Sequence, residues 1–298
     1  MPSSSRAQEK SVSRLIERLC NCKTEISTVE RCRKMGIEVA PISLEDMADP
    51  ELRPCYFRAT PSDFMEQHPI NQKYLQGLMK EDARSLTLRE YDPEVASKSG
   101  PTATLAERIA ANPAGRVRQI TRILDHYICH VVRDNMPYGY AMVHVRGWSY
   151  ACESDINPLA MAYYAPTNLI AYTKHRTVTI YEMDNHRMPH VAIVTEHFTH
   201  QETDEKDLYV HELVSILKAM SIRYSQPEFE QYKVIPVLLL SFMSPQNGRI
   251  LEANLDERNL IVRRSPMYSF KTNRDAPFEL FSRWLLGDPI GMTSITEE

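Results

Sequence analysis

The stretch 190-HVAIVTEHF-198, 207-DLYVHELVSILKAMSIRY-224 and 234-VIPVLLLSFM-243 decides the fold. Its first and third segments are short runs rich in Val, Ile and Leu, a composition typical of strands buried on both faces. The middle segment carries a broad apolar face at helical spacing. A helix between two such strands favours a right-handed crossover that joins parallel strands. We therefore expect a βαβ unit in an α/β or α+β fold built on a mixed β-sheet with packed helices.

Further elements on both sides of this unit extend the prediction to a mixed α/β core domain over residues 106–291. An amphipathic helical pattern covers 116–134, and the alternation in 138–146 indicates a strand. The short connection between TVTIYEMD and HVAIVTEHF favours an antiparallel hairpin. Two more segments, RILEANL and NLIVRRS, are separated only by DER and predict a second hairpin, and PFELFSRWLLG predicts a helix that ends at Gly287.

The N-terminal part of the chain has a less regular pattern. Residues 11–105 are punctuated by prolines, and we expect a helical and irregular region there. A helical pattern runs from Ser11 to Met35, and Gly36 is a plausible stop. The remaining expectations are a disordered tail at 1–10, short helices after Pro61 and over 72–83, and a loose tail at 292–298.

The composition excludes several classes of protein. The 298 residues carry a net charge of -4, which gives no sign of a nucleic-acid binder, so nucleic acid is an unlikely partner. No apolar run approaches the roughly 18 residues needed to cross a bilayer, so no membrane is expected, and the N-terminus lacks an apolar signal core. We expect a soluble intracellular protein, cytoplasmic or nuclear, whose six cysteines are free thiols. The nine glycines form no phosphate-binding loop, which disfavours dinucleotide and P-loop readings.

The C-terminal third resembles a group of uncharacterised proteins from filamentous fungi. The resemblance lies in KVIPVLLLSFMSPQNGRILEANLDERNLIVRRSPMYSF and in the ending F-x-x-x-x-RWLL-x-DPIG, and it covers roughly residues 190–291. It is a pattern of strands and turns. It implies a shared fold unit and no activity, because that group has none assigned.

The order helix, strand, strand, strand, helix, strand over 116–243 is similar to that of the PD-(D/E)XK nuclease core. That resemblance implies a carboxylate on the second strand, an acidic residue on the third and a lysine two residues later, which together hold a divalent metal and activate water. Glu196 takes the place of the acidic residue on the third strand, but Phe198 stands at the lysine position.

The hairpin pairing predicts which residues face Glu196. They are Lys174, His175, Arg176 and Thr177, and none is a carboxylate. Glu182 and Asp184 lie at the other end of the hairpin, very roughly 20 Å away at the rise of a strand. We therefore expect either a degenerate core or an ion-pair or polar-ligand cluster of Lys174, His175 and Arg176 around Glu196.

Histidines are concentrated beside Glu196. His197, His200 and His211 could converge at the C-terminal end of a strand, where open α/β sheets bind ligands. These three are the candidate metal ligands, and Glu196 with His200 the candidate catalytic pair; no cofactor beyond a possible divalent metal is indicated. The alternative is that they are surface loop histidines. His126 and His130 have the four-residue spacing of a helical metal site, but no third ligand completes a motif.

Two functions remain open. The first is an intracellular, non-enzymatic interaction or scaffold protein, favoured by the absence of catalytic motifs, with a protein partner bound through the N-terminal helical segment. The alternative to that partner contact is a helix packed on its own domain. The second function is a metal-dependent hydrolase or nuclease with a degenerate PD-(D/E)XK-like core, which would act through Glu196 and the histidines.

Overall fold

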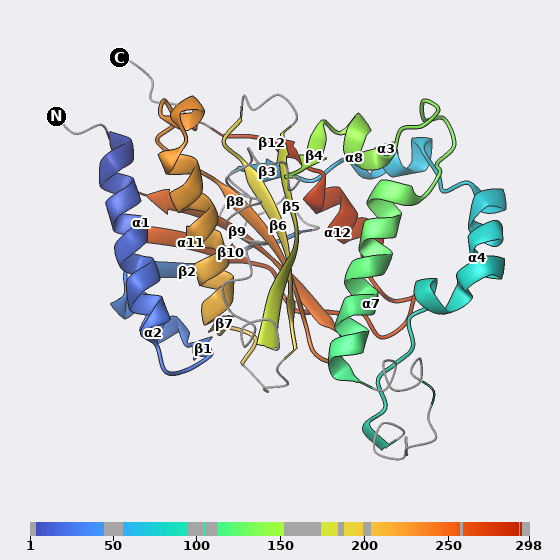
Figure 1. Ribbon diagram of the computed structural model, residues 1–298, viewed down its shortest axis with the longest axis horizontal. Coiled ribbons are helices and arrows are strands. Elements are labelled where there is room, and N and C mark those ends of the chain that lie inside the picture. Colours follow the sequence, from blue (N-terminus) through green and yellow to red (C-terminus); the bar gives the residue numbers. More distant parts are fainter. Residues whose placement is uncertain are drawn as a thin grey trace.

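A computed structural model describes residues 4–44, 56–94, 104, 112–151, 174–183, 188–198, 204–256, 259–291 and 293. Helices and strands alternate along the chain around one large mixed sheet and two strand pairs, β1 with β7 and β3 with β12 (Figure 1). Among these residues, no helix is both long and apolar enough to cross a membrane. The four cysteines within them are free, as expected.

The large sheet has the strand order β2-β10-β9-β8-β6-β5-β4, and the short β11 also pairs with β9. β6 and β8 are parallel, as are β2 and β10, and the other pairs are antiparallel. The strands are β2 (Ile37–Pro41), β4 (Trp148–Tyr150), β5 (His175–Met183), β6 (Val191–His197), β8 (Val237–Met243), β9 (Asn247–Asp256), β10 (Asn259–Arg264) and β11 (Tyr268–Ser269).

The predicted βαβ unit is confirmed. The helix α11 (Val210–Ser225) connects β6 to the parallel strand β8, and Val191 lies opposite Val237 in the register. Pro236 lies immediately before β8, where its missing N–H costs no ladder hydrogen bond. Both predicted hairpins are confirmed as well, since β5 pairs with β6 and β9 pairs with β10 in antiparallel fashion.

Helices cover both faces of the sheet (Figure 1). One face is covered by α11 and α1 (Ser4–Cys20), which pack against each other. The opposite face carries α7 (Pro113–Asp125) and α12 (Phe278–Leu285), together with the π-helix η2 (His126–His130) and the short α8 (Met142–Val145). We refer to these as the α11 face and the α7 face.

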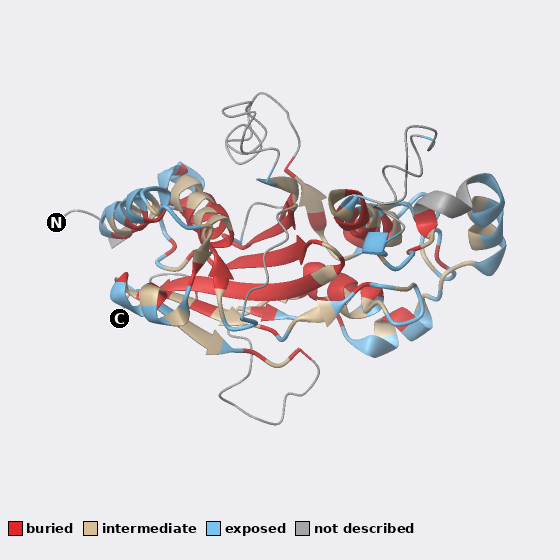
Figure 2. Cartoon of the chain, turned by 90° about the horizontal axis from the view of Figure 1, so that it is seen from below, coloured by how far each residue is buried: buried red, intermediate tan, exposed pale blue. Residues whose placement is uncertain are grey.

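The alternation of side chains along the central strands supplies a core on each face. In β6, Ile193 belongs to the core under α11, whereas the next residue, Val194, belongs to the core under α7. In β8, Leu239 and Leu240 divide in the same way. Because both faces are covered, the strands read as continuous apolar runs and the centre of the molecule is buried (Figure 2).

The N-terminal region is part of this fold and begins earlier than expected. Residues 4–10 form the first turns of α1, so the disordered tail predicted at 1–10 is wrong for them. Gln8 is buried on the same side of the helix as Val12, one turn later. The single helix expected over 11–35 is two helices, because Thr28 caps a new one, α2 (Val29–Lys34). Gly36, with φ of 78°, then leads into β2, an edge strand of the large sheet.

The helices expected after Pro61 and from Gln72 are present as α3 (Ser62–Gln67) and α4 (Gln72–Leu86). The remaining short elements are β1 (Ile26–Ser27), which pairs with β7 (Leu208–Tyr209), β3 (Phe57–Arg58), which pairs with β12 (Asp288–Pro289), and the 3-10 helix η3 (Pro227–Phe229). Apart from Thr293, the tail expected at 292–298 lies outside the described residues.

The strand predicted over 138–146 is wrong. Part of this segment forms α8, and the strand that pairs with β5 is β4, which follows it. Gly139 and Gly147 adopt positive φ values of 82° and 68° on either side, so the chain turns before and after a single helical turn. The alternating pattern was too short to separate a strand from this turn.

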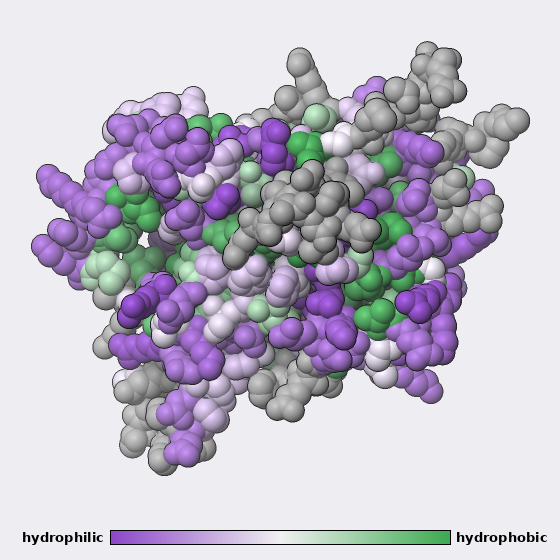
Figure 3. Space-filling view, turned by 180° about the vertical axis from the view of Figure 1, so that it is seen from behind, coloured by the Kyte–Doolittle hydropathy of each residue, from purple (hydrophilic) through white to green (hydrophobic). Residues whose placement is uncertain are grey.

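Seen from behind, the coloured surface is mostly hydrophilic, with hydrophobic residues in several smaller areas (Figure 3). This distribution agrees with a chain whose apolar residues are largely used in the two cores.

Candidate functional site

The residues predicted to form one site lie on opposite faces of the sheet. Glu196 and His197 are neighbours at the end of β6, and successive side chains of a strand point to opposite sides. Glu196 faces α7, where it contacts Thr121, and His197 faces α11, where it stacks against Tyr209 and His211. The proposed combination of Glu196 with His197 and His211 is therefore divided by the sheet.

On the α7 face, Glu196 is fully buried and paired. The Arg176 guanidinium donates from Nε to Oε2 at 2.5 Å and from Nη2 to Oε1 at 3.2 Å, and the Thr121 hydroxyl donates to Oε1. The register places Arg176 directly opposite Glu196. The sequence placed Thr177 there, one residue away, because it did not foresee the irregularity between Thr177 and Thr179.

The ion pair expected of Glu196 forms with Arg176 alone. Lys174 binds Glu25, which lies before β1, and His175 stacks on His211 across the other face. The predicted cluster of Lys174, His175 and Arg176 is therefore not one site. Successive side chains point to opposite faces of the sheet, so the three residues contact different partners.

No second carboxylate lies beside Glu196 among the described residues. Glu182 is opposite Val191 at the far end of the hairpin, and it binds Arg223 of α11 at 2.7 Å on the other face. Asp184 lies outside the described residues. At the lysine position, Phe198 lies under the Arg118 guanidinium, 4.9 Å from ring centroid to Cζ. Within the described ranges, the carboxylate pair and lysine that the nuclease order implies do not come together around Glu196.

On the α11 face, three histidine rings are stacked. The His211 ring lies between the rings of His175 and His197, with centroid separations of 4.0 Å and 3.8 Å. The Tyr209 ring stacks on His197 at 5.0 Å. We refer to His175, His197 and His211 as the histidine stack. His200, the other candidate, lies outside the described residues.

Burial keeps the histidine stack uncharged. His197 and His211 have pKa values well below the usual value for histidine, mainly because burial disfavours the charged ring and secondarily because neighbouring imidazoles and Arg249 oppose a further positive charge. Burial also lowers the pKa of His175, which lies at the rim. All three rings are therefore neutral at pH 7.

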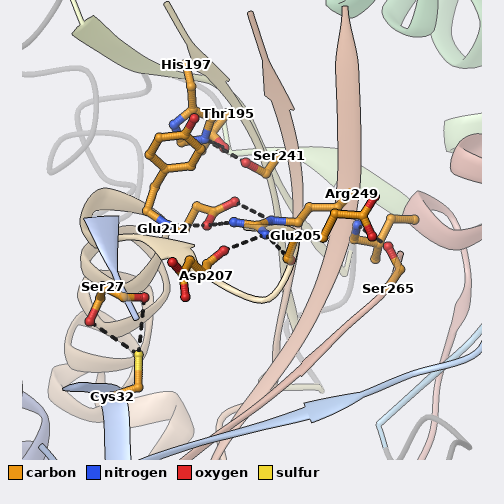
Figure 4. Close-up of polar contacts among 12 residues, drawn as sticks. Ser27, Cys32, Thr195, His197, Glu205, Asp207, Glu212, Ser241, Arg249 and Ser265 are labelled. Atoms are coloured by element: carbon orange, nitrogen blue, oxygen red, sulfur yellow. Dashed lines mark hydrogen bonds and ion pairs between the residues drawn. The ribbon is translucent and has the colours of Figure 1, made fainter. Parts of the chain in front are cut away.

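Neighbouring hydroxyls fix the orientation of His197. Its Nε2 lies 2.7 Å from the Ser241 Oγ of β8 and 3.2 Å from the Thr195 Oγ1 (Figure 4). In the described part of the chain, no group of three or more His, Cys, Asp or Glu side chains is arranged to hold a metal ion.

An ion pair beside the histidine stack joins α11 to β9. The Arg249 guanidinium binds the Glu212 carboxylate at 3.0 Å from Nε and 2.5 Å from Nη2, and its Nη1 donates to the Asp207 carbonyl at 2.8 Å (Figure 4). Glu212 also accepts the Tyr209 N–H at 2.8 Å. Sequence reasoning missed this pair, although a glutamate three residues into a helix is a recognisable capping signal.

A second buried pair lies at the other end of the same helix. Arg223 Nη2 binds Glu182 Oε2 of β5 at 2.7 Å, while Arg223 Nη1 donates to Gln226 at 3.0 Å. Glu212 lies in the first turn of α11 and Arg223 in the last, where each charge also suits the helix dipole. No sequence signal identified Glu182 as the partner, because its contact with Arg223 spans 41 residues.

The π-helix η2 carries another polar cluster. The Tyr150 hydroxyl lies 2.7 Å from Asp125 Oδ1 and 2.5 Å from Cys129 Sγ. Burial raises the pKa of the Cys129 thiol to about 12, which leaves it protonated and a poor nucleophile. His130 Nε2 lies 3.4 Å from Asp125 Oδ2, and the centroids of the His126 and His130 rings are 5.1 Å apart.

Comparisons of the chain with models of protein families, with curated proteins and with solved structures give no match. The resemblance to fungal proteins and the degenerate nuclease core therefore stay predictions.

Proposed function

We propose that this chain is a non-enzymatic protein-interaction module that acts inside the cell. The observation that carries the proposal is the state of Glu196. Its carboxylate has no exposed surface, and Arg176 and Thr121 occupy its oxygens. A catalytic carboxylate must reach a metal or a water near the substrate, and this one is arranged as a structural ion pair.

An exposed apolar surface supports the second half of the proposal. Six large apolar side chains are more than a third exposed in the described residues, and four of them lie between 132 and 145. Tyr138 is fully exposed and Tyr140 more than half, and exposed aromatic residues are common anchors of protein interfaces. Val132 and Val145 are the other two exposed apolar residues of this segment, and we refer to the exposed side chains of the four residues as the tyrosine surface.

The N-terminal segment offers a different kind of contact from the one expected. Val12, Leu15 and Leu19 of α1 are buried against the core under α11, so its apolar stripe is already occupied. A partner bound through α1 would therefore meet its exposed outer face, which carries Lys10 and Arg14.

The first experiment tests for catalysis. The purified chain and its Glu196→Gln variant are incubated with single- and double-stranded DNA and RNA in Mg²⁺ and in Mn²⁺. We expect no hydrolysis above the buffer control from either protein. Hydrolysis by the wild type that Glu196→Gln abolishes would overturn the proposal, provided that both proteins have the same circular dichroism spectrum.

The second experiment tests for binding. The full chain and a Tyr138→Ser, Tyr140→Ser variant are used to capture partners from the cells that naturally make this protein, and captured proteins are quantified by mass spectrometry. The exposed Lys73→Ser substitution on α4 is the matched control. We expect a protein retained by wild type and control and lost with the tyrosine variant. Equal recovery by all three would contradict a role for the tyrosine surface.

One observation supports a metal-dependent hydrolase or nuclease as the alternative. Among the described elements, α7, β4, β5, β6, α11 and β8 follow the expected order of helix, three strands, helix and strand, with η2 and α8 added before the first strand, β7 before α11 and η3 before β8. A degenerate relative of the PD-(D/E)XK core is consistent with this order and with the missing carboxylate pair. Activity in the first experiment decides between the two proposals.

A further inference from the structure

The histidine stack, together with the Tyr209 ring, brings four elements into contact at one end of the sheet. His175 starts β5, His197 ends β6, and His211 lies in the first turn of α11, next to Tyr209 of β7. β7 in turn pairs with β1, and the Val210 N–H donates to the Glu25 carbonyl at 2.8 Å. The stack is therefore the place where the start of α11 and the β1–β7 pair are held to the strands of the large sheet.

We propose that the histidine stack is an acid-sensitive latch, in which protonation of its rings releases β7 and the first turn of α11 from the ends of β5 and β6. The geometry makes the latch depend on neutral rings. The centroids of adjacent imidazoles are 3.8 Å and 4.0 Å apart, His197 is fully buried, and His211 is half-buried with its Nε2 shielded from solvent. A positive charge on His197 or at His211 Nε2 would be in contact with a neighbouring ring and shielded from water.

Among the described residues, the surrounding charges offset such a charge only in part. Glu212 favours protonation of His211, but both its oxygens bind Arg249 of β9. Arg249 opposes protonation of His197 and His211, and the neighbouring imidazoles oppose it as well. At the rim, Glu25 favours protonation of His175, but it is bound to Lys174, which opposes it.

The other groups found against the stack in the described part of the chain are neutral. They are the Tyr209 ring and the hydroxyls of Thr195 and Ser241. Arg176 and Glu196 lie on the opposite face of β5 and β6, where their charges are paired with each other. His197 Nδ1 and His211 Nε2 are buried and have no hydrogen-bond partner among the described residues, so an added proton there meets no acceptor.

The sign of the pH effect follows from this burial. In the released state each of the three histidines would be open to water and have its ordinary pKa of about 6.5, whereas the pKa values in the latched state are lower. The latch is therefore fully stable above about pH 7, and it weakens as the pH falls below the ordinary pKa, because the released state then binds more protons. One histidine shifted by a full pKa unit changes the opening equilibrium about tenfold.

The test is hydrogen–deuterium exchange of the full chain at pH 7.5 and 5.0, corrected for the intrinsic exchange rate. We expect protection of peptides that cover β7 and the first turn of α11 to fall at least tenfold at pH 5.0, while β9 and β10 stay protected. Unchanged protection at β7, or an equal loss throughout the chain, would overturn the proposal.

A variant separates the latch from general acid sensitivity. His211→Phe keeps an aromatic ring at the centre of the stack but removes its proton site, so we expect the pH-dependent loss at β7 to shrink several-fold. His144→Phe, at an exposed histidine that contacts Tyr140, is the matched control and should respond as the wild type does. If His211→Phe does not fold, His175→Phe at the half-buried rim gives the same comparison with a smaller effect. A pH-dependent loss of protection as large as in the wild type would show that the stack is not the sensor. This outcome is read from His211→Phe, or from His175→Phe if His211→Phe does not fold.

Discussion

The two faces of β6 treat buried polar groups in different ways. On the α7 face, Glu196 keeps its charge and is paired with Arg176, whose side chain is 36% exposed and connects the pair to solvent. On the α11 face, the adjacent His197 is fully buried against the half-buried His211, and both rings are neutral. A single residue step along the strand therefore separates a charged site from an uncharged one.

The difference teaches where this fold tolerates charge. A buried charge is costly unless a partner and further hydrogen bonds satisfy it. Glu196 has such partners, and so do two other buried acids, Glu182 of β5 and Glu212 of α11. The histidines have no bound carboxylate, and the lower-energy solution is to lose the proton.

The largest expected effect comes from the Arg249–Glu212 pair on the α11 face. Arg249→Met leaves the Glu212 carboxylate buried without its cation, and such a loss costs about 3–5 kcal/mol. We expect the free energy of unfolding in urea to fall by this amount at pH 7. Adding Glu212→Gln removes the stranded charge and keeps the hydrogen-bond acceptor, so the double variant should be more stable than Arg249→Met alone. A single variant within about 1 kcal/mol of wild type would contradict the interpretation.

A smaller effect is expected from the pair on the α7 face. Arg176→Met also strands a buried carboxylate, but Thr121 still donates to it and water can approach from the side that Arg176 now occupies. We expect a loss of about 2 kcal/mol, between the values typical of exposed and of buried pairs. Arg14→Met, on the exposed face of α1, is the matched control and should change stability little. A loss equal to that of Arg249→Met would remove the distinction between the two faces.

The smallest expected effects come from two hydroxyls that serve the two faces. Thr121→Val removes a donor to a charged carboxylate, and Ser241→Ala removes a partner of a neutral imidazole. Hydrogen bonds to charged groups are about twice as strong as neutral ones, so we expect losses of about 1.5 and about 0.8 kcal/mol. Chemical denaturation at pH 7 measures both. If Ser241→Ala costs more than Thr121→Val, the charge states assigned to the two faces are wrong.

The two ends of α11 offer a second comparison. An acid–arginine pair fastens each end to the sheet, with the acid on the helix at its start and the arginine on the helix at its end. This order agrees with the helix dipole at both positions. The histidine stack lies beside only the first pair, so acid should loosen the start of the helix before its end.

Much of the architecture was predictable because its signals are local. Short Val, Ile and Leu runs on both sides of an amphipathic helix indicate a buried βαβ unit whatever the rest of the chain does. The prediction was wrong where the local signal is weak. The alternation over 138–146 was too short to identify a strand. Residues 4–10 are mostly polar, and their helix is stabilised by the packing of α1 against α11, which the local sequence does not reveal.

The candidate site was predictable only in part. The sequence placed Arg176 near Glu196, because hairpin pairing is set by a short connection. It grouped Glu196 with His197 and His211, since residues close in sequence looked like one cluster. Three partners could not be predicted, because each is far away in the sequence. Thr121 is 75 residues from Glu196, Ser241 is 44 residues from His197, and Arg249 is 37 residues from Glu212.

By itself, then, the amino-acid sequence determined the parallel strand pair, its crossover helix and the shortage of catalytic motifs, because these depend on residue type and spacing within a few tens of residues. Only the tertiary structure decided what the polar residues at the end of β6 do. The pleat of the strand sends Glu196 to an arginine and a threonine on one face and His197 to a histidine and a tyrosine on the other. Charge state follows from those neighbours, and elements distant in the sequence supply most of them.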